Sequence, residues 1–483
     1  MYLKRYESVC GEPCISLRLK KSRKERRGCK GYVSGRRETV MQSINQKCLK
    51  IIQLTPGAGE MYCGNCLRDN ALTAGWLRLG HDVCMVPLYL PLTLDEPDQS
   101  ENVPVFFGGI NVFMSHKVPR LWHFVPQQMR RWLDSRRLLK SIGKRVSKTN
   151  PAEVGALTVS MLKGEAGSQQ RELRELSEWL REQKPDVISF SNALLLGMNN
   201  YLRKETGAKT VCFLTGEDTF LDTLPEPYRT QSWSLVRRHI QQIDLLLAPS
   251  RYYAGLMSTR LEVPKERIHV VYNGINTEGY ADQTVADTTV AGEIRRPPVL
   301  GYFARMCAPK GLDILVEAFL EIRRRGNVPN LQLKIGGNLN PWNEPLVQQL
   351  KQKIETAGYL PDVRFYPNVS RAEKITFLQS VDVFSVPAVC HEPFGLYVIE
   401  ALAAGVPAVL PAQSAFPELI EKSGGGLLYP PEDSLALVEA LETLFTDKMK
   451  RQQLSLAGRK SALEFFSVQR AAKESMELIL DLF

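Results

Sequence analysis

Two glutamates in the C-terminal half, Glu392 and Glu400, lie eight residues apart in the segment HEPFGLYVIEALAAGVP, residues 391–407. The apolar run at 382–387 predicts a strand, so Glu392 is expected on the loop after it and Glu400 about one and a half turns into the next helix. Gly395 lets a ligand approach the backbone, and the first N–H groups of a helix attract anions. The two carboxylates could therefore hold different parts of one extended ligand.

Two basic residues stand near the start of another predicted helix. Arg305 and Lys310 belong to GYFARMCAPKG, where the strand predicted at 299–305 gives way to that helix. A cation about 4 Å from a phosphate contributes on the order of 4 kcal/mol at an effective dielectric constant near 20, and only the part gained in the transition state raises the rate. The pair could therefore stabilise an anionic group of a ligand.

The segment around Glu392 resembles the Glu-x7-Glu motif of the large retaining family called glycosyl transferases group 1, which has two Rossmann-like domains in a GT-B type fold. Its members continue with Glu-Ala-x-Ala-x-Gly-x-Pro, as residues 400–407 do here. The resemblance implies that Glu392 contacts the sugar of a nucleotide-sugar donor and that Glu400 binds the ribose hydroxyls. It also implies that three backbone units hold sugar and phosphate oxygens, those of Phe394, Gly395 and Leu396.

Other segments of the C-terminal half are similar to the same family. The segment with Arg305 and Lys310 resembles its Gly-Arg-x(n)-Lys-Gly run, with Ala304 where glycine is usual. This similarity implies that both cations hold the donor diphosphate. Gly336, in the Gly-Gly pair at the end of a predicted strand, matches the position beside the nucleotide base. The run VVYNGIN at 270–276 resembles a family segment before the linker, and its Asn-Gly pair predicts a turn.

Gly-rich and acidic segments of the N-terminal half suggest further contacts. Gly57 and Gly59 lie in the loop TPGAGEMY, where backbone amides could approach the donor, and the resemblance implies a glycine pair here. After the predicted strand at 210–215 the family often has a histidine or an acidic residue. This chain has threonine at 215, followed by Glu217 and Asp218. Either acid could orient or deprotonate an acceptor hydroxyl, and a helix N-cap is the alternative for Asp218.

A hydrogen-bonding contact is also suggested by Ser191 and Asn192 at another strand end. No cofactor beyond the donor substrate and no metal ion are expected. The one close cysteine pair, Cys63 and Cys66, lacks the second pair of ligands that a structural zinc site requires.

Short apolar runs alternate with amphipathic segments, which predicts an α/β fold with two doubly wound parallel sheets. Strands are expected at 49–55, 82–88, 186–190, 210–215, 245–250 and 269–274 in the first sheet, and at 299–305, 331–337, 363–368, 382–387, 407–412 and 426–430 in the second. Expected helices include 68–79, 170–183, 231–242, 312–325, 344–357, 371–379, 395–405 and 433–447. Ligands of such sheets bind beyond the carboxyl ends of the strands, so a cleft between two facing domains is the expected site.

The chain is predicted to have five parts. These are a basic, disordered extension at 1–46, an acceptor domain at 47–280, a linker at 281–297, a donor-binding domain at 298–465 and a C-terminal helix at 466–483 that crosses back to the first domain. Residues 1–40 hold twelve Lys or Arg against four Glu, so they carry most of the formal net charge of +10. The first convincing strand begins shortly after Met41, which is the predicted start of the native protein.

Two interpretations stay open for residues 115–150, which combine ten Lys or Arg with one Asp and interleaved aromatic residues. The spacing fits a core helix with a solvated opposite face, or a basic surface that contacts an anionic membrane or a lipid-linked acceptor. No apolar run approaches the roughly 18 residues that span a bilayer. A cytoplasmic location is expected, with peripheral contact at the inner membrane face as the second interpretation.

These features predict a retaining hexosyltransferase that moves a sugar from a nucleotide-diphosphate sugar to the hydroxyl of a sugar, a glycan or a lipid-linked glycan. Retention rests on the resemblance alone. No nucleic-acid partner is expected, because the folded part lacks zinc-finger, RNA-recognition and basic-zipper spacing. The alternatives are a nucleotide-sugar epimerase of the same fold and a non-catalytic binding protein.

Overall fold

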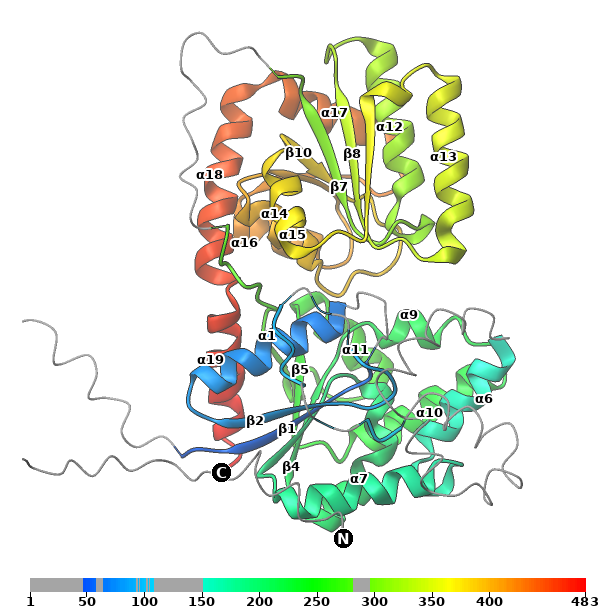
Figure 1. Ribbon diagram of the computed structural model, residues 1–483, viewed down its shortest axis with the longest axis vertical. Helices are drawn as coiled ribbons and strands as arrows, with labels where there is room; N and C mark the ends of the chain where they lie inside the picture. The colour runs from blue at the N-terminus through cyan, green and yellow to red at the C-terminus, as the bar shows by residue number, and fades with distance from the viewer. Residues whose placement is uncertain are drawn as a thin grey trace, which may run out of the picture. The chain divides into compact units, whose positions relative to one another are not determined.

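The computed structural model describes residues 47–57, 64–92, 94, 96–100, 103, 105–107, 151–280 and 296–483. One compact unit spans Cys48–Phe483 and contains two six-stranded parallel sheets (Figure 1). Every strand and helix range that the sequence predicts overlaps an observed element of the same type. The prediction of an α/β fold with two parallel sheets is confirmed.

The first sheet has the strand order β2-β1-β3-β4-β5-β6, and the second has the order β12-β11-β10-β7-β8-β9. The strands are Lys50–Thr55 (β1), Asp82–Pro87 (β2), Val187–Phe190 (β3), Lys209–Phe213 (β4), Leu245–Ala248 (β5), Ile268–Val270 (β6), Val299–Phe303 (β7), Gln332–Gly337 (β8), Val363–Pro367 (β9), Val383–Ser385 (β10), Ala408–Pro411 (β11) and Gly426–Tyr429 (β12). The order reverses at β1/β3 in the first sheet and at β7/β10 in the second. Open α/β sheets bind ligands at such switch points.

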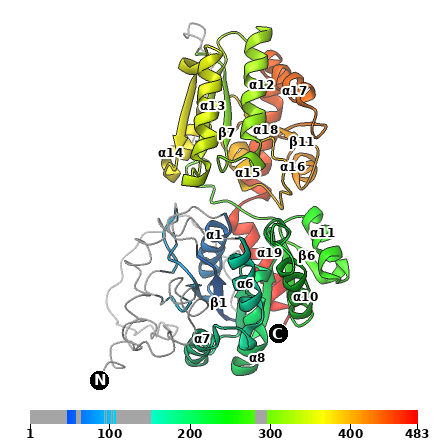
Figure 2. The same ribbon diagram turned by 90° about the vertical axis from the view of Figure 1, so that its right-hand side faces the viewer.

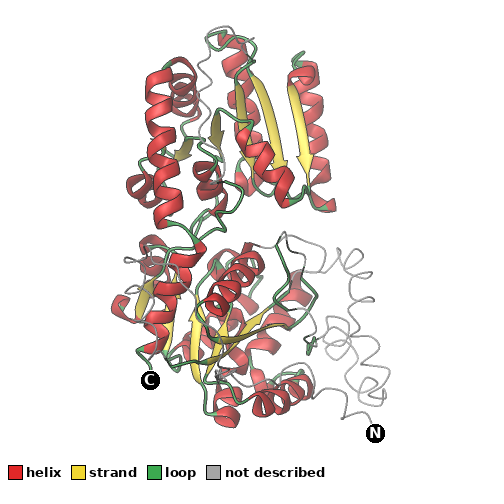
Figure 3. Ribbon diagram, turned by 60° about the vertical axis from the view of Figure 1, so that its left-hand side comes forward, coloured by secondary structure: helices red, strands yellow, loops and turns green. Residues whose placement is uncertain are grey.

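Helices flank the strands of each sheet (Figure 3). The α-helices are Gly64–Arg78 (α1), Pro151–Leu162 (α6), Gln170–Gln183 (α7), Asn199–Thr206 (α8), Glu217–Leu221 (α9), Tyr228–Ile240 (α10), Arg251–Leu261 (α11), Leu312–Arg325 (α12), Glu344–Thr356 (α13), Arg371–Gln379 (α14), Leu396–Ala403 (α15), Phe416–Ser423 (α16), Ser434–Thr446 (α17), Lys448–Phe465 (α18) and Val468–Leu480 (α19). Helices α12 and α13, which follow strands β7 and β8 of the second sheet, lie side by side (Figure 2). No helix of the described segments combines the length and the apolar composition needed to cross a bilayer.

Central strands are buried on both faces. In β1, Ile51 packs with Trp76 of α1 and Ile479 of α19, whereas Ile52 packs in the cluster that contains Leu176 of α7. Successive side chains of a strand point to opposite faces, so a strand with helices on both sides must be apolar throughout. This is why uninterrupted apolar runs located the strands so well.

The C-terminal helix packs on the first sheet. Between α18 and α19, Val468 N–H donates to the carbonyl of Ile275 at 2.9 Å, and Ile275 N–H donates to the carbonyl of Phe466 at 2.8 Å. Further along α19, the Trp76 indole donates to the Ser475 hydroxyl at 3.0 Å. The chain therefore returns to the first sheet after completing the second.

The predicted turn at Asn273–Gly274 is wrong. Neither residue lies in a turn, and the next residue, Ile275, bridges to the backbone of Ser467. A Cβ at Gly274 would lie 2.3 Å from the Ser467 carbonyl oxygen. Close approach of two chain segments, and not turn geometry, therefore accounts for this glycine.

Candidate functional site

The carboxyl edge of the second sheet brings Lys310 and Glu392 together. Lys310 ends the short turn after β7, and Glu392 lies on the loop between β10 and α15. The Lys310 ammonium forms a close ion pair with Glu392 Oε2, which also accepts a hydrogen bond from the Tyr397 hydroxyl at 2.6 Å. The two ion-pair side chains are 16% and 10% exposed, so the pair is largely shielded from water.

Protonation of this cluster follows from its burial and its charges. Burial lowers the pKa of Lys310, whereas the nearby Glu392 carboxylate and Cys390 raise it. The second effect is the larger one, so the pKa of Lys310 lies above its ordinary value. Burial, followed by the charge of Glu392, raises the pKa of Tyr397. At neutral pH Lys310 is therefore a cation and Tyr397 a hydrogen-bond donor.

A second lysine holds the second glutamate. Lys374 Nζ of α14 lies 2.7 Å from Glu400 Oε1 of α15, and their side chains are 10% and 18% exposed. The sequence predicted the helix that carries Lys374 but gave no sign of this contact. A lysine on the buried side of an amphipathic helix was the only available signal.

The start of α15 offers backbone groups. Gly395 is its N-cap and has a φ of +95°, which favours glycine. No side chain of the N-cap residue accepts a hydrogen bond from the first N–H groups of the helix. Phe394 is 2% exposed, and its ring packs against Tyr272 and Phe466. The Phe394 side chain is therefore part of the core, and Leu396 is the first residue of the helix.

Arg305 and Gly336 flank the same edge. Arg305 is exposed, and its side chain makes no hydrogen bond or ion pair with the part of the chain that the structure describes. Its carbonyl accepts a hydrogen bond from the Tyr302 hydroxyl at 2.7 Å. Gly336, near the end of β8, accepts a hydrogen bond from Ala304 N–H at 3.3 Å. The loop of Arg305 is thus held by both strands while its guanidinium stays available.

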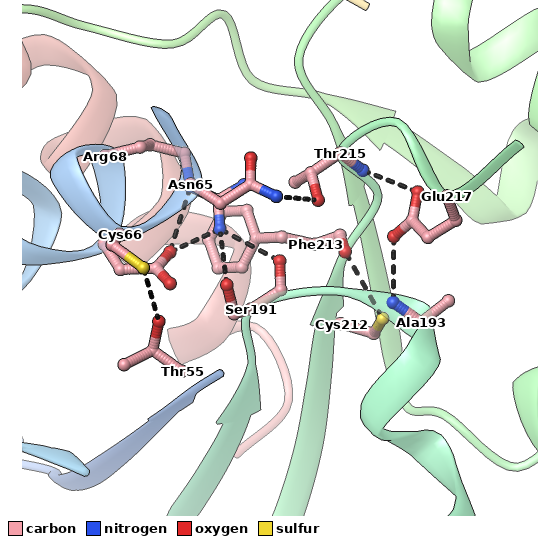
Figure 4. A network of polar contacts seen from close by, with 11 residues as sticks. Thr55, Asn65, Cys66, Arg68, Ser191, Ala193, Cys212, Phe213, Thr215 and Glu217 are labelled. Carbon is pink, nitrogen blue, oxygen red and sulfur yellow. Dashed lines mark hydrogen bonds and ion pairs between the residues drawn. The ribbon is translucent and has the colours of Figure 1, made fainter. Parts of the chain in front are cut away.

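At the carboxyl edge of the first sheet, Glu217 is buried after β4. Its Oε1 accepts a hydrogen bond from Ala193 N–H at 2.8 Å, and its Oε2 accepts one from Thr215 N–H at 2.8 Å (Figure 4). Oε2 also accepts a hydrogen bond from Gly216 N–H at 3.0 Å. Burial nevertheless raises the pKa of this carboxyl, although the hydrogen bonds oppose the shift. Glu217 therefore fastens the end of β4 to the segment after β3.

Tyr253 connects Glu217 to its neighbour Asp218. The Tyr253 hydroxyl lies 2.9 Å from Glu217 Oε2 and 2.8 Å from Asp218 Oδ1, and it accepts a hydrogen bond from Gly216 N–H at 2.8 Å. Burial, followed by the two carboxylates, raises the pKa of Tyr253. The Tyr253 hydroxyl proton can be donated to only one of the two carboxylates at a time. The N-cap alternative for Asp218 is wrong, because Gly216 caps α9.

A histidine reaches Asp218 from the other sheet. His391 Nδ1 lies 3.1 Å from Asp218 Oδ2, and the side chains are 52% and 0% exposed. The sequence lacked the histidine expected after β4, and threonine stands in that place. The structure supplies an imidazole from the residue before Glu392, a contact that sequence reasoning missed.

Arg68 of α1 occupies the edge between β1 and β3. Its guanidinium forms a close ion pair with Asp69, donates to the carbonyl of Ser191 at 3.0 Å and lies 4.6 Å from the centre of the Phe213 ring (Figure 4). Asp69 Oδ2 is buried and has no hydrogen-bond partner among the described residues. Ser191, a suggested ligand contact, is therefore engaged with Arg68.

Two other predicted contacts have local roles. Asn192 caps a short helical turn by accepting from Leu194 N–H at 3.0 Å. Gly57 has a φ of +75°, and a Cβ there would lie 1.8 Å from the Leu90 carbonyl oxygen, so backbone packing accounts for this glycine. Gly59, Cys63 and the basic segment 115–150 lie outside the described residues.

A metal site is not evident within the described segments, where no group of three or more His, Cys, Asp and Glu could hold an ion. The chemistry at these edges is that of fixed cations, carboxylates and backbone N–H groups. Such a set can bind a polyhydroxyl compound that carries a diphosphate.

Two family descriptions match the chain. Residues 153–278 match Glycosyltransferase Family 4, and residues 289–461 match Glycosyl transferases group 1. A phosphatidyl-myo-inositol mannosyltransferase of Mycobacterium leprae is 28% identical over 212 residues, which cover 44% of this chain and 51% of that protein. The chain spans about half the length of the curated relatives it matches.

Solved structures share the whole fold. A sucrose-phosphate synthase from Thermosynechococcus elongatus has a TM-score of 0.64 at 16% identity, over 90% of this chain and 99% of that one. HepE from Anabaena, determined in complex with UDP-glucose, has a TM-score of 0.60 at 18% identity, over 90% and 100% of the two chains. The GT-B type fold is thereby confirmed.

Proposed function

Since the chain belongs to the glycosyl transferases group 1 family, we propose that it transfers a sugar from a nucleotide-diphosphate sugar to a hydroxyl acceptor, with retention of anomeric configuration. The observation that carries the proposal is the set of charges at the carboxyl edge of the second sheet. Lys310 pairs there with Glu392, Arg305 is exposed nearby, and Glu400 lies on the following helix.

In the proposed complex, the cations bind the diphosphate. The Lys310 ammonium has three N–H donors, so it can keep its contact with Glu392 and still donate to a phosphate oxygen. Arg305 can offer a planar fork of donors to the same group. N–H groups at the start of α15 add a partial positive charge. All three become more effective as negative charge develops on the leaving group.

The carboxylates bind hydroxyls at the two ends of the donor. Glu392 receives sugar hydroxyls, and Glu400, held by Lys374, receives those of the ribose. Gly336 lies where the base would approach the backbone. The acceptor oxygen then forms a bond to the anomeric carbon while the bond to the diphosphate oxygen breaks and its electron pair leaves with the nucleotide.

The acceptor is proposed to meet the donor at the edge of the first sheet, near Asp218. A sugar, a glycan and a lipid-linked glycan all provide the necessary hydroxyl. The mannosyltransferase relative is named for a phosphatidylinositol acceptor, so phosphatidylinositol and free myo-inositol belong among the first acceptors to try. HepE was determined with UDP-glucose, which makes that donor the first to try.

A two-stage assay tests the proposal. The melting temperature is measured with UDP-glucose, GDP-mannose and ADP-glucose, and release of nucleoside diphosphate is then followed with each acceptor. We expect one donor to raise the melting temperature and the acceptor to stimulate release. Conversion of the donor to its epimer without an acceptor, or no response to any sugar nucleotide, would contradict the proposal.

A further inference from the structure

His391 and Asp218 come from different sheets yet meet at 3.1 Å. Asp218 is completely buried in the first turn of α9, and His391 lies half exposed on the loop before α15. A second contact holds that loop against the first sheet, because the Ser250 hydroxyl donates to the carbonyl of Pro393 at 2.7 Å. The imidazole is therefore positioned by both sheets.

The partner of Nδ1 determines which nitrogen faces a ligand. Asp218 accepts hydrogen bonds through Oδ1 from Tyr253 and through Oδ2 from His391, so its carboxylate favours a proton on Nδ1. The unprotonated nitrogen of a neutral His391 is then Nε2. The half-exposed ring leaves Nε2 able to accept a proton from a hydroxyl group.

The ring is also next in sequence to Glu392, the proposed sugar contact. The ring contacts Asp218, which is linked through the Tyr253 hydroxyl to Glu217. Glu392 itself pairs with Lys310. A base at this position therefore directly precedes the proposed sugar contact in the sequence.

The geometry points to His391 as the catalytic residue that receives the proton of the acceptor hydroxyl, with Asp218 as its positioning residue. This inference rests on the proposed function. The acceptor oxygen bonds to the anomeric carbon, its proton moves to His391 Nε2, and the electron pair of the broken bond leaves on the diphosphate. The Asp218 carboxylate stabilises the imidazolium that forms.

Activity measurements on His391→Gln test the inference. The assay follows release of nucleoside diphosphate from UDP-glucose, GDP-mannose or ADP-glucose, whichever binds the wild type, with water and with myo-inositol as acceptors between about pH 5 and 8. We expect kcat to fall about 100-fold or more with donor binding unchanged. We expect the wild-type rate to fall on the acid side of this range and the variant to lack this fall. His269→Gln, an exposed histidine of β6, is the matched control and keeps wild-type behaviour.

Nitrogen NMR of the His391 ring provides a readout that needs no turnover. The neutral ring is expected to carry its proton on Nδ1 in the wild type and to lose this preference in Asp218→Asn. A proton on Nε2 in the wild type would overturn the inference, as would a His391→Gln variant with an unchanged rate and acid limb. A wild type that binds no sugar nucleotide would instead contradict the proposed function, so the two failures are distinguishable.

Discussion

The carboxyl edges of the two sheets hold their charges in different ways. In the second sheet, Glu392 and Glu400 each pair with a lysine, and the four side chains keep between 10% and 18% of their surface exposed. In the first sheet, Glu217 and Asp218 are 3% and 0% exposed and are satisfied by backbone N–H groups, Tyr253 and His391.

This difference suggests a division of work. An ion pair whose side chains keep 10–18% of their surface exposed can exchange one partner for a ligand group. A buried carboxylate that already accepts several hydrogen bonds gains little from a ligand and instead fixes its surroundings. The second-sheet edge is therefore suited to bind a charged donor. The first-sheet edge is a rigid support, and the half-exposed His391 connects it to the ligand side.

The largest effect is expected from Lys310→Met. This variant removes the proposed diphosphate contact and leaves Glu392 largely buried without its cation. If the full effect of one cation, on the order of 4 kcal/mol, applies in the transition state, kcat falls about 1000-fold. Lys353→Met removes an exposed pair with Glu317 and should change kcat less than twofold. Equal kcat values for Lys310→Met and Lys353→Met would contradict the role of the second-sheet edge in binding the donor.

Glu217→Gln should act on stability. Both carboxylate oxygens of Glu217 accept backbone N–H groups, so the amide NH₂ of glutamine must face a donor in either orientation. Leaving a buried donor unsatisfied costs about 1–3 kcal/mol in the free energy of unfolding. Urea unfolding measures this loss. An unchanged midpoint would show that the first-sheet edge is not a rigid support.

The same residue gives the stability a pH dependence. Burial raises the pKa of Glu217 in the folded state, so the folded protein binds this proton more tightly than the unfolded chain. The resulting stabilisation is complete below the unfolded pKa and is lost as the pH rises through the folded pKa. As the pH rises from the ordinary glutamate range through the raised pKa of folded Glu217, the free energy of unfolding of the wild type should decline. Glu217→Gln should lack this part of the decline. Urea unfolding at several pH values measures both.

A smaller effect is expected from Lys374→Met. Without its lysine, Glu400 keeps its charge but loses its fixed orientation toward the proposed ribose hydroxyls. We expect the KM for the donor to rise about tenfold, equivalent to about 1.4 kcal/mol, with kcat nearly unchanged. Lys374→Arg should restore part of the affinity. A fall in kcat with constant KM would place Lys374 with the leaving-group cations instead.

The sequence predicted the second sheet's edge better than the first's, for a physical reason. Glu392, Gly395 and Glu400 are close in sequence, so one loop and one helix bring them together. Arg305 and Lys310 likewise lie on the one short segment between β7 and α12. Local geometry was sufficient to predict these groups.

Contacts between distant segments could not be predicted in the same way. His391 and Asp218 are 173 residues apart, and their meeting depends on how two separate sheets pack. The sequence gave no sign of the roles of Tyr253 and Lys374, because their partners lie on other elements. The close approach of Gly57 to the Leu90 carbonyl is likewise a contact between distant segments that the sequence does not show.

A crystal soaked with the sugar nucleotide that stabilises the protein most tests the central claim directly. The account predicts the diphosphate at Arg305, Lys310 and the first N–H groups of α15, with the sugar at Glu392 and the ribose at Glu400. A diphosphate bound anywhere else in a fully occupied complex would contradict it.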